Sequence, residues 1–203
     1  MLRVGLTGGL ASGKSFVGRA LSELGCFLIE ADELGHQVMA KGAEAYQPIL
    51  EQFGLAILNE ESEIDRRKLG AQVFDQPDLL AKLSAIVHPA VRERSRHLSE
   101  DFARSHPRGI IVYEAAILIE TGSFRDFDRL IVATCTEEQQ VARAVLRDHL
   151  TREEVQSRLR RQMPLEEKVK YADYVIDTSG TKEHTLEQTR TVYASLRRLQ
   201  QQS

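Results

Sequence analysis

The sequence predicts an α/β fold, in which helices form the two outer layers around a five-stranded, mainly parallel sheet. Two observations support this prediction. Short apolar runs alternate with segments of helical periodicity, as they do where helices connect parallel strands. The first of these runs leads into a glycine-rich loop that is followed at once by a helical pattern.

Five apolar runs are the predicted strands. Their consecutive Val, Ile and Leu residues are typical of strands that helices cover on both faces. The runs are residues 2–6, 26–29, 110–113, 130–133 and 174–176.

A long helical stretch separates the second and third runs. A βαβ crossover needs only one helix, whereas residues 43–106 contain several segments of helical spacing. This stretch is therefore predicted to be an inserted helical subdomain. Residues 1–42 and 107–203 would form the core, with a helical lid at about residues 143–170.

Composition narrows the class of protein. The 203 residues include 42% hydrophobic and 28% charged residues, and the net charge of -3 argues against a dedicated nucleic-acid binder. No apolar run approaches the roughly 20 residues that span a bilayer, and the N-terminus lacks a targeting pattern. Cys26 and Cys135, each placed in a predicted strand, are expected to be reduced thiols. We therefore expect a cytoplasmic protein without nucleic-acid or membrane partners, a monomer or a small homo-oligomer.

The glycine-rich loop matches the phosphate-binding motif G-x-x-x-x-G-K-[ST] in full, between a strand and a helix. Glycines let successive backbone N–H groups point at phosphate oxygens, and the N-terminus of the helix adds partial positive charge. Lys14 would contact the β- and γ-phosphates of ATP, and the Ser15 hydroxyl would bind Mg²⁺. The predicted nucleotide-binding residues of the loop are Gly8, Gly9, Leu10, Ala11, Ser12, Gly13, Lys14, Ser15 and Phe16.

Two carboxylates follow predicted strands at the edge where this loop lies. Asp32 could orient an acceptor hydroxyl and take its proton as a general base, or it could cap the helix that follows. Glu114, at the end of the third strand, could bind Mg²⁺ directly or through water, or it could be a solvated strand-end carboxylate.

Arginines are concentrated in the predicted lid, where they could stabilise phosphate charge and help to exclude water. Arg143 and Arg147 are the preferred phosphate contacts among them. The turn from Asp177 to Gly180 follows the fifth strand and could present backbone groups to adenine, although such turns are common.

Taken together, these residues resemble the dephospho-CoA kinase family over nearly the whole chain. The resemblance is carried by the phosphate loop and by a series of segments in the family's order and spacing. These segments are Ile29-Glu30-Ala31-Asp32, Val87-His88-Pro89, residues 114–120, the R-x-x-x-Q pattern of residues 158–162 and the ending at residues 172–180. Glu30, Ala116 and Thr178 depart from the family's usual aspartate, proline and asparagine.

The resemblance implies a P-loop kinase-like fold and a reaction. The chain would phosphorylate the ribose 3′-hydroxyl of dephospho-CoA with ATP and Mg²⁺, with Asp32 as the general base. The insert would bind CoA, with His88 lining that pocket and Glu114 near the substrate. Two alternatives remain open at this point: a kinase for another small acceptor, such as a nucleoside monophosphate, and a regulatory NTPase switch.

Overall fold

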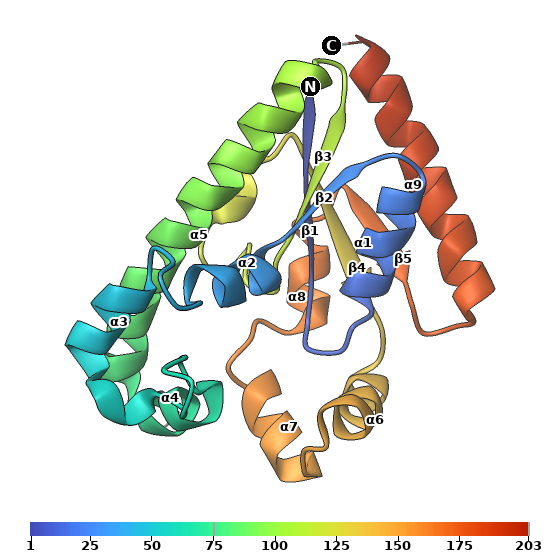
Figure 1. Ribbon diagram of the computed structural model, residues 1–203. Coiled ribbons are helices and arrows are strands. Elements are labelled where there is room, and N and C mark those ends of the chain that lie inside the picture. The colour runs from blue at the N-terminus through green and yellow to red at the C-terminus, as the bar shows by residue number, and fades with distance from the viewer. Residues whose placement is uncertain (75, 203) are drawn as a thin grey trace. The chain divides into compact units, whose positions relative to one another are not determined.

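The computed structural model describes residues 1–74 and 76–202. The chain folds into two compact units, and Figure 1 colours the chain by residue number from blue at the N-terminus to red at the C-terminus. The first unit combines Met1–Glu30 with Phe102–Ser203, and the second is Ala31–Asp101. The sequence-based boundaries at residues 43 and 106 stay a prediction.

A five-stranded sheet forms the centre of the first unit, and its strand order is β2-β3-β1-β4-β5. All four neighbouring pairs in the described residues are parallel, which confirms the predicted fold class. Glu114 on β3 is in register with both Leu6 on β1 and Glu30 on β2. The strands are β1 (Leu2–Gly8), β2 (Phe27–Glu30), β3 (Ile110–Glu114), β4 (Arg129–Thr134) and β5 (Tyr174–Asp177).

Helices connect these strands, and two begin where the sequence predicts. Thr136 and Thr151 each accept from the backbone N–H three residues on, and Gln139 and Glu154 bond back to complete two capping boxes. The helices are α1 (Lys14–Glu23), α6 (Glu137–Asp148), α7 (Arg152–Leu159), α8 (Leu165–Val169) and α9 (Lys182–Gln202), with a short 3₁₀ turn, η2 (Ser123–Asp126).

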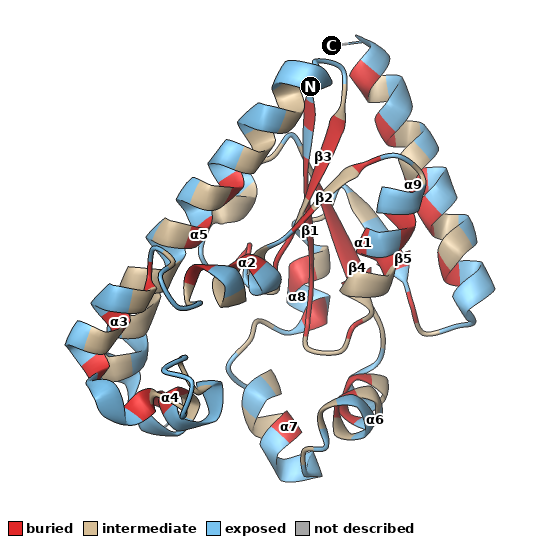
Figure 2. Ribbon diagram, in the orientation of Figure 1, coloured by how far each residue is buried: buried red, intermediate tan, exposed pale blue. Residues whose placement is uncertain are grey.

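The core of the first unit lies between the sheet and the neighbouring helices α1 and α9 (Figure 2). Both helices bury residues at helical spacing, Val17 and Leu21 in α1 and Val192 and Leu196 in α9. These side chains pack against strand residues that are almost completely buried, namely Val4, Leu6, Val112, Ile131 and Ile176.

Both cysteines lie just outside strands, which corrects the sequence-based placement. Cys26 immediately precedes β2, and Cys135 immediately follows β4. Both are free thiols. Burial raises the pKa of the Cys26 thiol to about 12, although the positive charge of Arg197 opposes this shift. Cys26 is therefore a protonated core residue near neutral pH.

The second unit is helical, as the spacing predicts for most of its length. Helix α3 precedes the 3₁₀ turn η1 in the sequence and helix α4 follows it. Each has a buried apolar side chain, Ile49 in α3 and Leu69 in α4. The Asp65 carboxylate caps α4 by accepting from the N–H groups of Arg67 and Lys68. The elements are α2 (Ala31–Val38), α3 (Tyr46–Phe53), η1 (Leu55–Ile57), α4 (Arg66–Val73) and α5 (Pro77–Ser105), whose last four residues belong to the first unit.

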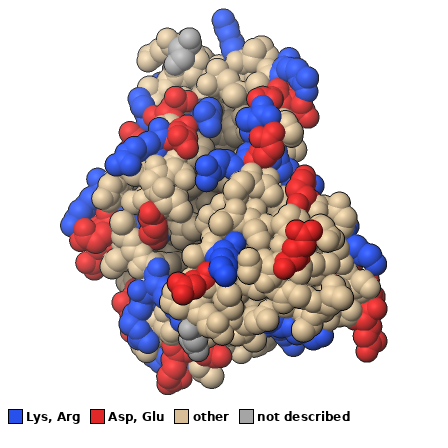
Figure 3. All heavy atoms as spheres, turned by 90° about the vertical axis from the view of Figure 1, so that its left-hand side faces the viewer, with Lys and Arg blue, Asp and Glu red and all other residues tan. Residues whose placement is uncertain are grey.

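Charges of both signs are interspersed on the surface drawn in Figure 3. On α5, Arg96 pairs with both Glu93 and Glu100, one turn away on either side. Among the described residues, no helix combines the length and the apolar character needed to cross a membrane.

We predict that Leu196→Ala lowers the free energy of unfolding by about 2–5 kcal/mol, because it leaves a cavity where the wild-type side chain is fully buried. The matched control is Leu146→Ala on α6, where the leucine is 80% exposed and the change should stay within about 0.5 kcal/mol. Urea unfolding of both variants measures the difference. Equal effects would contradict the placement of α9 in the core.

Candidate active site

The phosphate loop joins the carboxyl end of β1 to α1. Gly13 is the N-cap residue of α1 and has a φ of 87°, a left-handed conformation that favours glycine. A Cβ at this position would also lie 2.9 Å from Thr178 Oγ1. Since Gly13 has no side chain that could cap the helix, the first-turn amides of α1 suit an anionic ligand.

The Glu114 carboxylate organises the start of α1. It comes from the end of β3, is only 4% exposed and accepts a 2.6 Å hydrogen bond from Ser15 Oγ. Lys14 Nζ lies 3.4 Å from the same oxygen, Glu114 Oε1. The structure thus brings the predicted residues Lys14, Ser15 and Glu114 into contact. Glu114 is buried, so the alternative of a solvated carboxylate at the strand end is wrong.

The same cluster fits Mg²⁺. Glu114 Oε2 is buried and has no hydrogen-bond partner among the described residues, although a carboxylate oxygen ordinarily has one. A hydroxyl and a carboxylate are oxygen ligands of the kind that Mg²⁺ prefers. Ser15 and Glu114 are therefore the residues suited to bind the ion together with phosphate oxygens.

Helices α6 and α7 pack directly on the phosphate loop. Val141, Ala144 and Val155 form a small buried cluster, and Leu10 and Ala11 of the loop pack against it. Two of the four variable residues of the motif thus contact the predicted lid through apolar side chains.

Two glutamines fix the backbone of Leu10 from both sides. Gln140 of α6 donates to the Leu10 carbonyl at 2.7 Å, and Gln162, which follows α7, accepts from the Leu10 N–H at 2.9 Å. Gln162 is the glutamine of the R-x-x-x-Q pattern. The loop conformation therefore depends on side chains more than 120 residues away in the sequence.

Arg143 binds the turn after β5. Its guanidinium donates to Thr178 Oγ1 at 3.1 Å and to the Thr178 carbonyl at 2.6 Å. Thr178 Oγ1 in turn donates to the Ser12 carbonyl of the phosphate loop at 2.8 Å. Arg143 is therefore connected to the phosphate loop through the side chain of Thr178.

The other sequence-predicted residues of this region are more exposed. Arg147 pairs with the neighbouring Asp148, whose pKa this pairing lowers. Asp177 accepts from the Ser179 N–H at 2.8 Å, and this hydrogen bond lowers the pKa of its carboxyl. Asp177 thereby shapes the turn, and Gly180, also exposed, lies just beyond it.

A buried lysine lies behind the loop. Lys168 of α8 has no exposed surface, and its ammonium group contacts the Gly8 and Ala116 carbonyls and the Glu120 carboxylate. Burial lowers the pKa of Lys168, and the nearby charge of Lys14 lowers it further, while Glu120 raises it.

The second unit contains Asp32 and His88, and both are exposed there. Asp32 lies in the first turn of α2, which begins at Ala31, so it is not the residue that precedes the helix as an N-cap would. His88 lies within α5 immediately before Pro89.

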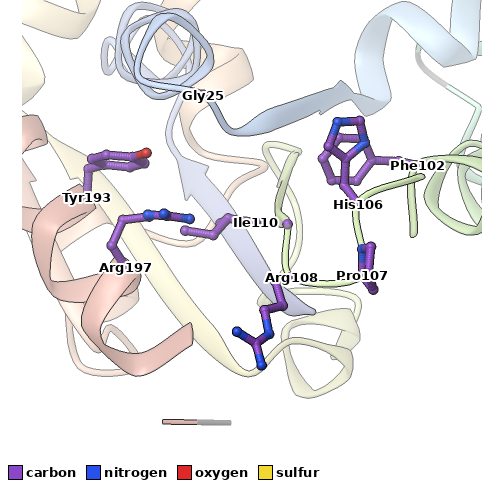
Figure 4. A pocket seen from close by; sticks show the side chains of 9 residues that line it. Gly25, Phe102, His106, Pro107, Arg108, Ile110, Tyr193 and Arg197 are labelled. Carbon is purple, nitrogen blue, oxygen red and sulfur yellow. The ribbon is translucent and has the colours of Figure 1, made fainter. Parts of the chain in front are cut away.

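A cavity of about 340 Å³ lies in a different part of the first unit (Figure 4). Its lining includes Gly25, just before β2, and Ile110, the first residue of β3, so it opens at the amino ends of the strands. Tyr193 and Arg197 of α9 and the stacked rings of Phe102 and His106 complete most of the wall. No predicted site residue lines it, and the phosphate loop is at the opposite, carboxyl edge.

Sequence reasoning gave no role to Lys168 or Gln140, and from the turn that contains Thr178 it expected only backbone groups near adenine. Lys168 had one available signal, because it lies three residues after the buried Leu165 and therefore on the same face of α8. The contacts of Gln140 and Thr178 join polar side chains to distant backbone, and no local pattern identifies such pairs.

Comparisons with known proteins agree on one family. A family model described as "Dephospho-CoA kinase" matches residues 2–184. A protein from Aquifex aeolicus named "Dephospho-CoA kinase" is 41% identical over 202 residues, covering 98% of this chain and 99% of that protein.

Two solved structures are similar along 96% of both chains. One is TT1252 from Thermus thermophilus, with a TM-score of 0.81 and 31% sequence identity. The other is the dephospho-CoA kinase from Campylobacter jejuni, with a TM-score of 0.63 and 25% identity.

We predict that Gly18→Ala weakens ATP binding chiefly when Mg²⁺ is present. The new Cβ would lie 2.6 Å from Glu114 Oε2, so the carboxylate would have to move away from its place beside Ser15. Calorimetric titration with ATP, with and without Mg²⁺, measures the effect.

Gly70→Ala in α4 is the matched control, since its Cβ would meet no atom of the described residues within 4 Å. This change should leave ATP binding unaltered and stabilise the chain by about 0.5–1 kcal/mol, the usual difference between alanine and glycine in a helix. Unchanged Mg²⁺-dependent binding in Gly18→Ala would show that the position of Glu114 does not matter.

Proposed function

Because the chain belongs to the dephospho-CoA kinase family, we propose that it transfers the γ-phosphate of ATP to the ribose 3′-hydroxyl of dephospho-CoA, giving ADP and CoA in the final step of coenzyme A biosynthesis. The observation that carries this proposal is the family match along nearly the whole chain. The cluster of Lys14, Ser15 and Glu114 supports it with the chemistry that phosphoryl transfer requires.

We assign the binding of ATP to the phosphate loop. The loop from Gly8 to Phe16 would surround the β- and γ-phosphates, and Lys14 would balance the charge that spreads over the transferred group. Ser15 and Glu114 would bind Mg²⁺, which, when present, neutralises phosphate charge. Adenine would lie near Asp177 and Gly180.

The acceptor side is assigned to Asp32. Its carboxylate would orient the 3′-hydroxyl and accept its proton as the new P–O bond forms. The connectivity of the chain supports this assignment, because Asp32 lies only two residues after Glu30 in the sequence and two residues span at most about 7 Å. Glu30 is in register with Glu114, the partner of Ser15 and Lys14. His88 is proposed to line the CoA pocket.

The helices α6 and α7 are proposed to be the core of the lid. Its role would be to exclude water, since an open site would let ATP react with water instead of the acceptor. Arg143 and Arg147 would contact phosphate, and for Arg143 this requires it to exchange its bonds to Thr178 for bonds to ATP.

The proposed setting is the cytoplasm, where the enzyme would act as a monomer or a small homo-oligomer. The two free cysteines support a reducing compartment.

We predict that Asp32→Asn lowers kcat by at least about 100-fold and leaves the Kd of ATP within about twofold. The amide can still bind a hydroxyl but cannot accept its proton, and the contribution of a general base is typically 10²–10⁴-fold. Glu33→Gln is the matched control in the same helical turn and should keep wild-type turnover. Wild-type turnover in Asp32→Asn would remove Asp32 from the mechanism.

The acceptor is tested by ADP release with dephospho-CoA as the only acceptor, against a panel of nucleoside monophosphates. Dephospho-CoA should give rapid ADP release and the panel only background release. Lys14→Ala should lower both ATP affinity and kcat, because the ammonium group contacts phosphate before and during transfer. ADP release that is independent of any acceptor would instead favour a regulatory NTPase.

A further inference from the structure

We propose that Lys168 is a positioning residue for the ATP site. Its buried ammonium group fixes the backbone at the end of β1, where the phosphate loop begins, and just beyond the end of β3. This inference deepens the proposed function and rests on it for the identity of the reaction. Lys168 would not touch the substrates but would act through the Gly8 and Ala116 carbonyls.

The contacts of the ammonium group use all three of its hydrogens. Lys168 Nζ lies 3.2 Å from the Gly8 carbonyl oxygen, 2.6 Å from the Ala116 carbonyl oxygen and 2.9 Å from Glu120 Oε1. Gly8 is the last residue of β1 and the first glycine of the loop, and Ala116 lies two residues beyond Glu114. One cation therefore connects the residues that begin the phosphate loop to those that follow the carboxylate of the site.

Glu120 extends these contacts to the end of the lid. The oxygen that contacts Lys168 also accepts from the Met163 N–H at 3.0 Å, and the neighbouring Gln162 accepts from the Leu10 N–H. Residues 162–168 thus contact the loop at Leu10 and again at Gly8. These residues follow α7, so they add to the contacts that α6 and α7 themselves make with the loop.

Electrostatics give a reason for a lysine at this position. A carbonyl oxygen directed toward a phosphate would repel it, and the ammonium group attracts the Gly8 and Ala116 oxygens to itself. The same charge lies near Lys14, as its effect on the pKa of Lys168 shows, and adds positive potential behind the loop. Burying an ammonium group carries a desolvation cost that its contacts have to offset, so a buried ion pair is by itself weak evidence of a stabilising role.

The alternative to a positioning role is that Lys168 and Glu120 form a purely structural ion pair. Two variants that differ only in the ammonium group of residue 168 distinguish these two roles. Glu120→Gln keeps Lys168 and removes the carboxylate charge. The double variant Lys168→Met/Glu120→Gln removes both charges, so no unpaired buried charge remains to destabilise the fold. Lys170→Met is the control, since Lys170 is an exposed lysine of the same segment that pairs with Glu167.

The measurements are the Kd of ATP by calorimetry, the KM of dephospho-CoA and the denaturation midpoint. We expect the double variant to bind ATP at least about tenfold more weakly than Glu120→Gln, with a KM for dephospho-CoA within about twofold. Its denaturation midpoint should be no lower than that of Glu120→Gln, because the single variant leaves the buried ammonium group without its carboxylate. Lys168→Met alone should lose both ATP affinity and stability, and Lys170→Met should match the wild type.

Equal ATP affinity in Glu120→Gln and the double variant would overturn the proposal. ATP affinities that follow the denaturation midpoints from variant to variant would also overturn it, because a purely structural role predicts that relation. The ATP titration needs no acceptor. A tenfold loss of ATP affinity in a protein that does not phosphorylate dephospho-CoA would therefore support the positioning role and count against the proposed acceptor.

Discussion

The structure of the site depends on one buried carboxylate. Glu114 accepts a hydrogen bond from the Ser15 hydroxyl at 2.6 Å and lies 3.4 Å from the Lys14 ammonium, so it fixes the first turn of α1. Its position depends on the parallel sheet, because Glu114 ends β3 in register with Leu6, two residues before β1 ends. A preorganised site of this kind needs little rearrangement when charge develops during transfer.

Long-range hydrogen bonds hold the rest of the loop. Gln140 and Gln162 bind the backbone of Leu10, Thr178 binds the Ser12 carbonyl, and Lys168 binds the Gly8 carbonyl. Each comes from the chain after β4, where helices α6 to α8 and the turn beyond β5 lie. The predicted lid and the loop are therefore one connected structure, in which a shift of α6 changes the surroundings of Leu10.

Local signals made much of this structure predictable. The motif from Gly8 to Ser15, the apolar strands and the two threonine capping boxes depend on residues close in sequence, and the structure contains all of them. β2 lies one residue later than predicted, since Cys26 is as apolar as a strand residue but precedes the first ladder pair. The phosphate-loop partners of Gln140, Thr178 and Lys168 are 130 to 166 residues away, so only the folded chain brings them together.

The two distances at Glu114 also indicate how ATP could enter a site that is already paired. The Lys14–Glu114 contact at 3.4 Å is longer than the 2.6 Å hydrogen bond from Ser15, so the lysine is the less closely held of the two partners. Lys14 can then bind phosphate while Ser15 and Glu114 stay together, which leaves their oxygens in place for Mg²⁺. A shorter Lys14–Glu114 pair would hold the loop more firmly but compete more strongly with ATP, so the observed geometry favours exchange of the lysine.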